Sequence, residues 1–195
     1  MKRILVLVVA LLLVIPFNVK AYSEDTKYNT LGLKEALEVE ELEEEFEEYE
    51  ETDDQVTIYL FRRDGCYYCR GFLSFLNSIA DEYGKYFKLV SYEVSTDQQN
   101  SELFAEVSKF KDGQEATGVP YIVIGDQVFG GYAEDYDQSI LAAIMNLYNT
   151  PKEDRYDVLY ELAHQPNHDT TVAVISIAVV AAFVGTIVYT RKKVK

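Results

Sequence analysis

The order of strand-like and helix-like segments between residues 55 and 150 restricts the fold more than any other feature of the chain. A β-branched and aromatic run, a helical repeat, a second such run and a second helical repeat follow one another. Two short apolar runs then flank Gly125-Asp126, a two-residue hairpin signal, before a last helical repeat. The segments are 56–61, 72–83, 87–94, 103–110, 121–124, 127–129 and 136–148. This order predicts an α/β fold, a βαβαββα sandwich with one hairpin.

The two cysteines of the chain, Cys66 and Cys69, lie three residues apart in the sequence RRDGCYYCRG. The predicted layout places them after the first strand, at the start of the first helix. Free backbone N–H groups and the helix dipole stabilise a thiolate there, and Arg62, Arg63 and Arg70 add positive charge. Because the thiolate is the attacking species, we predict that Cys66 is the exposed nucleophile and Cys69 the resolving thiol.

A structural zinc site and a structural disulfide are the alternatives for this cysteine pair. A zinc site needs four ligands, whereas the chain offers two thiols and two distant histidines, His164 and His168. A disulfide that closes so short a loop would constrain the unfolded chain little. The sequence therefore favours a redox dithiol, and we assign no metal site.

Three motifs in this region resemble those of a known family. Cys66-Tyr67-Tyr68-Cys69 is similar to the active-site motif of the glutaredoxins, with Tyr67 in place of their usual proline. Thr117-Gly118-Val119-Pro120 resembles the loop that carries the family's cis-proline, and Gly130-Gly131 resembles the glycine pair after its hairpin. Residues 55–150 thus resemble a thioredoxin-superfamily domain of the glutaredoxin type.

The resemblance implies a cis Val119–Pro120 bond that faces the dithiol, with the backbone of Val119 binding the substrate. Further substrate contacts are expected from Tyr67, Tyr68 and Gly118.

The chain also departs from this family. No tryptophan precedes Cys66, and the first strand has no buried acid such as thioredoxins use for the resolving thiol. Glu93 on the second strand either replaces that acid or faces solvent. Glutaredoxins use glutathione, which we do not carry over to a domain expected outside the cell, so no cofactor is assigned.

Two apolar segments near the ends of the chain predict where the protein works. Residues 1–21 begin with a basic pair and an apolar run and end in Val19-Lys20-Ala21, which is typical of a cleaved secretory signal peptide; an uncleaved anchor is the alternative. Residues 170–190 hold no charge and precede a basic tail at 191–195, which predicts a transmembrane helix with a cytoplasmic C-terminus. We therefore expect a single-pass protein of the cell membrane with an extracytoplasmic catalytic domain.

Acidic residues dominate the rest of the chain. The formal charge is −15, and without the seven cations of the two end segments the remainder carries −22. This charge argues against nucleic acid and anionic lipid headgroups as partners.

The most acidic block lies within 22–54, where five apolar residues fall near one helical stripe. They are Leu33, Leu37, Leu42, Phe46 and Tyr49. We predict an acidic helical arm over 22–54, either a spacer or mobile arm or a partner-binding helix. Residues 151–169 are predicted to be a linker with a short helical patch at 156–164.

Together these features predict a membrane-anchored, extracytoplasmic thiol–disulfide oxidoreductase that acts on protein cysteines. The alternatives are a non-catalytic thioredoxin-fold binding module and a dedicated maturation factor for one exported partner. The expected partners are protein thiols or disulfides and a separate membrane or secreted redox protein, because the chain has no further cysteine to reset the pair.

Overall fold

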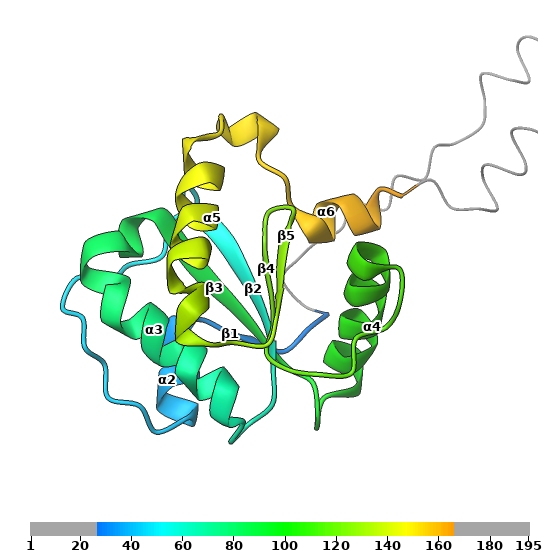
Figure 1. Ribbon diagram of the computed structural model, residues 1–195, viewed down its shortest axis with the longest axis horizontal. Helices are drawn as coiled ribbons and strands as arrows, with labels where there is room; N and C mark the ends of the chain where they lie inside the picture. The colour runs from blue at the N-terminus through cyan, green and yellow to red at the C-terminus, as the bar shows by residue number, and fades with distance from the viewer. Residues whose placement is uncertain (1–26, 166–195) are drawn as a thin grey trace, which may run out of the picture.

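A mixed five-stranded sheet with helices on both faces forms the protein in the computed structural model, which describes residues 27–165 (Figure 1). The strands are β1 (Thr30–Leu31), β2 (Val56–Arg62), β3 (Phe87–Glu93), β4 (Tyr121–Ile124) and β5 (Gln127–Gly130), in the sheet order β1-β3-β2-β4-β5. Strands β2 and β3 are parallel, and the other neighbours pair antiparallel. The α-helices are α2 (Leu33–Val39), α3 (Tyr67–Tyr83), α4 (Gln98–Asp112), α5 (Asp137–Asn149) and α6 (Val158–Ala163).

The central strand β2 is buried on both faces, which explains its continuous apolar sequence. Side chains alternate along a strand, so Ile58 and Leu60 point to one face, and Tyr59 and Phe61 point to the other. Helices α2, α3 and α5 pack on the first face, and α4 and α6 pack on the second (Figure 1). The protein is therefore a three-layer α/β/α sandwich.

The predicted βαβαββα order is confirmed from β2 to α5. The hairpin prediction is confirmed as well, because Ile124 pairs with Gln127 and leaves Gly125-Asp126 as the two-residue turn. Gly125 has a φ of 58°, which glycine adopts without the steric cost that a side chain brings.

The segment 30–49 packs on the domain and contributes buried apolar side chains to its core, so the prediction of a spacer or mobile arm is wrong for this segment. Strand β1 pairs antiparallel with β3, and Leu33 and Leu37 of α2 are fully buried against the sheet. Further along, Phe46 and Tyr49 are buried too. Tyr49 lies so close to Gly84 that a Cβ on this glycine would come within 2.7 Å of its ring.

The predicted helix through Tyr49 is also wrong, because α2 has only seven residues. The following glutamate run places like charges three and four residues apart, which disfavours a helix. Side chains of α3 instead form hydrogen bonds with the backbone of residues 43–47. Asn77 accepts the N–H of Glu45 at 3.0 Å and donates to the carbonyl of Glu43 at 2.8 Å, and Asp81 accepts the N–H of Glu47 at 2.8 Å.

The described part of the predicted linker, up to residue 165, packs against the domain. Helix α6 matches the predicted helical patch, and its Val158 and Leu159 are buried beside α4. Asp157 caps this helix and accepts a hydrogen bond from the Tyr59 hydroxyl at 2.6 Å. The predicted signal peptide, transmembrane helix and basic tail lie outside the described residues. From residue 27 to residue 165, no helix has the length and apolar character needed to cross a membrane.

Candidate active site at the start of helix α3

Cys66 is the N-cap residue of α3 and is partly exposed. The chain turns into the helix at Gly65, whose φ of 69° favours glycine. The Sγ atom of Cys66 accepts the backbone N–H of Cys69 at 3.3 Å, as a capping oxygen does in other helices. The same sulfur lies 3.8 Å from the carbonyl oxygen of Val119, to which the thiol donates. Cys66 therefore meets both the free N–H groups of a helix and the loop that ends at Pro120.

Cys69 lies one turn further along α3 and is fully buried. Burial raises the pKa of the Cys69 thiol, and the hydrogen bond with Cys66 and the charge of Glu40 raise it further. Both cysteines are free thiols. The more exposed sulfur is thus the one predicted to attack, and the buried sulfur is the one predicted to resolve the mixed disulfide. Both roles stay predictions.

The predicted cis bond between Val119 and Pro120 is confirmed, and the loop lies against Cys66 as expected. The carbonyl of the buried Pro120 accepts the N–H of Gly131 at 2.8 Å, so the predicted glycine pair adjoins the same loop. Gly118 is exposed on this loop, next to the half-buried Val119. The structure therefore brings Cys66, Val119 and Pro120 together, while their role in binding a substrate stays a prediction.

Two tyrosines separate the cysteines and form an exposed aromatic pair. The side chains of Tyr67 and Tyr68 are 81% and 58% exposed, and their ring centroids lie 5.4 Å apart, edge to face. Exposed aromatic rings beside a reactive sulfur offer apolar contact area to a partner. The predicted substrate contacts of both residues remain untested.

A groove of about 350 Å³ begins beside the cis-proline loop and follows the first turns of α4. Its wall includes Arg63, which precedes Cys66 by three residues, and Val119, whose carbonyl oxygen lies 3.8 Å from Cys66 Sγ. Val94, Phe104 and Thr117 also line it. The groove mixes apolar and polar groups.

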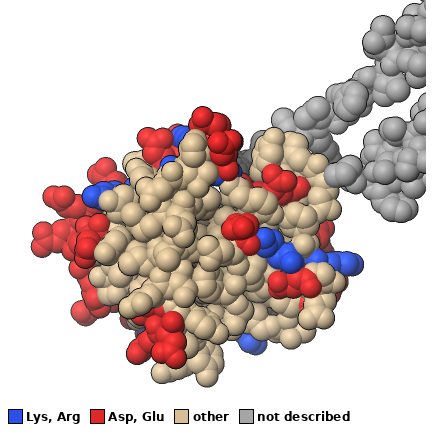
Figure 2. All heavy atoms as spheres, turned by 45° about the horizontal axis from the view of Figure 1, so that its top comes forward, with Lys and Arg blue, Asp and Glu red and all other residues tan. Residues whose placement is uncertain are grey.

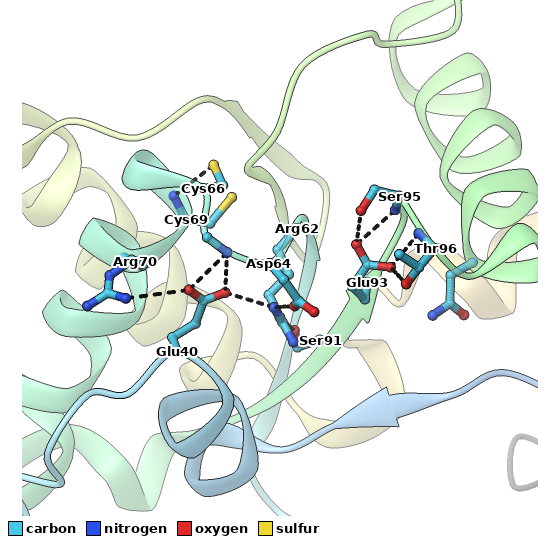
Figure 3. A network of polar contacts seen from close by, with 12 residues as sticks. Glu40, Arg62, Asp64, Cys66, Cys69, Arg70, Ser91, Glu93, Ser95 and Thr96 are labelled. Carbon is cyan, nitrogen blue, oxygen red and sulfur yellow. Dashed lines mark hydrogen bonds and ion pairs between the residues drawn. The ribbon is translucent and has the colours of Figure 1, made fainter.

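Sequence reasoning missed a buried ion pair behind the dithiol (Figure 3). Arg62, the last residue of β2, is 1% exposed, and its Nη1 lies 3.0 Å from a carboxylate oxygen of Glu40, which is 2% exposed. The Nε atom of Arg62 donates to Ser91 Oγ at 2.8 Å, and its guanidinium also pairs with Asp64. The strand alternation that buries Ile58 and Leu60 places Arg62 on the same face, so the sequence held a signal for it.

Glu40 also holds the turn before Cys66. Both of its carboxylate oxygens accept the backbone N–H of Gly65 at 3.3 Å, and Nη1 of Arg70 lies 3.9 Å from one of them. Arg62 and Arg70, expected to support the thiolate, are thus engaged with a carboxylate. No sequence signal distinguishes Glu40 within the run of glutamates around it.

Glu93 does not replace the missing buried acid. Its carboxylate accepts hydrogen bonds from the backbone N–H groups of Ser95 at 2.9 Å and Thr96 at 2.7 Å, and also from their hydroxyls (Figure 3). Partial burial would raise the pKa of Glu93, but the hydrogen bonds from Ser95 and Thr96 lower it to about 2. Glu93 therefore stabilises the turn after β3, and the interpretation that it serves the dithiol is wrong.

The molecular surface carries the acidity seen in the sequence. Figure 2 shows one face on which Asp and Glu side chains gather in several groups along the edge, whereas Lys and Arg side chains are few. Such a surface repels polyanions, so the absence of nucleic acid among the partners stays our expectation. Across residues 27–165, no three His, Cys, Asp or Glu side chains are grouped so as to hold a metal ion.

Comparison with protein families places part of the chain in a known domain family. The family model of the thioredoxin-like domain matches residues 42–146, slightly more than half of the chain. The matched range contains Cys66, Cys69 and Pro120 but begins after α2 and Glu40. Comparisons with curated proteins and with solved structures found no match.

Proposed function

The chain belongs to the thioredoxin-like domain family, and on this premise we propose that it is a thiol–disulfide oxidoreductase acting on protein cysteines through Cys66 and Cys69. The observation that carries the proposal is the difference between the two sulfurs. Cys66 is partly exposed at the start of α3, whereas Cys69 is buried one turn further in. An accessible sulfur at a helix start beside a second, protected thiol is the arrangement that disulfide exchange requires.

In the reducing direction, the thiolate of Cys66 attacks one sulfur of a substrate disulfide and forms a mixed disulfide. The other substrate sulfur leaves as a thiolate and takes up a proton. Cys69 then loses its proton and attacks Cys66, which forms the Cys66–Cys69 disulfide and releases the second substrate sulfur, which is protonated in turn. Two electrons and two protons pass to the substrate in total, and the reverse sequence oxidises a substrate dithiol.

The cis-proline loop supports the proposal because it offers backbone groups beside the nucleophile. The Val119 carbonyl lies 3.8 Å from Cys66 Sγ, so a substrate segment that binds this loop would bring its own sulfur next to Cys66. Tyr67 and Tyr68, the next two residues in the chain, add exposed apolar area.

The test uses a short peptide whose disulfide holds a fluorophore next to a quencher. The reduced protein should cleave this disulfide and separate the fluorophore from the quencher, so the fluorescence should rise with second-order kinetics. Cys66→Ser should abolish the rise. Cys69→Ser should allow at most one attack per molecule and no turnover. A wild-type protein that does not react, with both thiols shown to be free, would favour the non-catalytic binding module.

We also propose that the domain works outside the cytoplasm and is anchored by residues 170–190, with a separate redox protein resetting the dithiol. The support is the sequence alone, namely the uncharged segment, the basic tail and the absence of further cysteines. A thiol reagent that cannot cross membranes should label Cys66 in intact cells after mild reduction, and Cys66→Ser should remove this labelling. Labelling only after lysis would contradict the proposed location.

A further inference from the structure

We propose that Glu40 is a positioning residue of the dithiol: its carboxylate holds the turn before Cys66, and its negative charge lowers the reactivity of the pair. The inference deepens the proposed function and rests on it only for the identity of the reactive pair. Glu40 precedes the residues that the family model matches, so it lies in a segment of this chain outside the matched thioredoxin-like range.

Glu40 is the C-cap residue of α2, and its carboxylate reaches over to the loop between β2 and α3 (Figure 3). Both oxygens accept the N–H of Gly65, the residue directly before the nucleophile. Because Leu33 and Leu37 anchor α2 in the core, this carboxylate is fixed relative to the sheet. The position of the turn, and with it the position of Cys66, therefore depends on Glu40.

Four charged groups meet behind the dithiol from different elements, namely Glu40 from the end of α2, Arg62 from β2, Asp64 from the loop and Arg70 from α3. Their formal charges cancel. Glu40 and Arg62 are almost fully buried, so solvent screens their charges less than it screens exposed ones. Removal of the Glu40 charge would leave a net positive charge behind both sulfurs, which favours thiolates.

The direct test compares Glu40→Gln with the wild type and with Glu38→Gln, a matched control that removes an exposed carboxylate from the same helix. The readout is the rate of Cys66 alkylation by iodoacetamide as a function of pH, in a Cys69→Ser background. We expect the midpoint of this profile to fall by about one pH unit in Glu40→Gln and to stay unchanged in Glu38→Gln. A folded Glu40→Gln protein with the wild-type midpoint overturns the proposal.

A second readout is the equilibrium with glutathione in the protein that keeps both cysteines. Because a stabilised thiolate favours the reduced pair, Glu40→Gln should shift the equilibrium about three- to tenfold toward the dithiol. A purely structural role would lower the thermal midpoint without moving this equilibrium. An unchanged equilibrium in a folded variant contradicts the proposed effect of the charge.

Two further outcomes keep the test decisive. If Glu40→Gln does not fold, Asp64→Asn removes the more exposed carboxylate from the same network, and the alkylation midpoint should then fall by a smaller amount. No change in Asp64→Asn would overturn the electrostatic argument. A shifted midpoint in a protein that never reacts with the disulfide peptide would reject the proposed function and keep the role of Glu40, because alkylation needs no substrate.

Discussion

The backbone N–H of Cys69 donates to the Sγ atom of Cys66 across 3.3 Å, so the side chain of Cys66 caps the first turn of α3. The contact places the two cysteines on one helical turn with opposite accessibility, since Cys66 is partly exposed and Cys69 is buried. An N–H group directed at the sulfur stabilises its thiolate form. One turn of α3 thus holds an accessible sulfur and a protected one, and we predict that Cys66 is the attacking thiol and Cys69 the resolving thiol.

Alkylation of the reduced protein should separate the two thiols. We expect iodoacetamide to modify Cys66 at least about 100-fold faster than Cys69 at pH 7, because Cys69 is buried and burial raises the pKa of its thiol. Mass spectrometry of peptides after short exposure measures both rates. Unfolding in urea should equalise them, and a faster reaction at Cys69 in the folded protein would reverse the assigned roles.

Trapping should identify the partners. In Cys69→Ser the resolving step is lost, so Cys66 should stay linked to its substrates and to the protein that resets it. The adducts should appear as high-mass bands on a non-reducing gel and collapse on reduction. Adding Cys66→Ser should abolish them, and bands that persist in this double variant would show that another route forms them.

The sequence predicted the elements that follow from local pattern. A run of β-branched and aromatic residues located β2, the helical repeats located α3 and α5, and Gly125-Asp126 located the hairpin. The dithiol and the cis-proline loop followed from motifs of a few residues. These features depend on contacts within a short stretch of chain or on a family resemblance.

The N-terminal part could not be predicted in the same way. Leu33, Leu37 and Tyr49 fit one helical stripe, yet α2 ends at Val39. The backbone that follows is held by hydrogen bonds to a side chain of α3. The Glu40–Arg62 pair joins residues 22 positions apart, and nothing local indicates which glutamate is buried. Contacts of this kind depend on the tertiary fold and not on sequence periodicity.

The inclusion of α2 in the core can be tested with two substitutions on that helix. Leu37→Ala removes a fully buried side chain and should lower the free energy of unfolding by about 2–5 kcal/mol. Val39→Ala changes a side chain that is 49% exposed on the same helix and should have a much smaller effect. Urea denaturation followed by circular dichroism measures both. Equal, small effects would restore the original interpretation of a loosely attached arm.

The buried ion pair should show strong coupling in a double-mutant cycle. Arg62→Met leaves the Glu40 carboxylate buried without its main cation and should cost about 3–5 kcal/mol of unfolding free energy. The double variant Arg62→Met/Glu40→Leu should recover part of this loss, because neither charge remains. The exposed Lys152–Asp54 pair is the control, and Lys152→Ala should leave stability nearly unchanged. Additive effects of the two buried substitutions would show that the pair does not act as a unit.

Glu93 should make stability depend on pH in the acidic range. Its pKa is lowered from 4.5 to about 2 in the folded protein, so the folded state binds the proton more weakly than the unfolded state does. The carboxylate therefore contributes its full stabilisation at pH values well above 4.5, and this contribution is lost progressively as the pH falls through 4.5 toward 2.

The thermal midpoints of the wild type and Glu93→Gln measure this contribution. We expect the wild type to melt at the higher temperature at pH 7, where its carboxylate accepts the hydrogen bonds from Ser95 and Thr96. The difference should shrink as the pH approaches 2, because the protonated carboxyl group then resembles the amide. Glu102→Gln on the exposed side of α4 serves as the control for the general effect of removing a negative charge. A wild-type advantage that stays constant from pH 7 to pH 2, or one that Glu102→Gln reproduces, would show that the turn does not depend on the Glu93 charge.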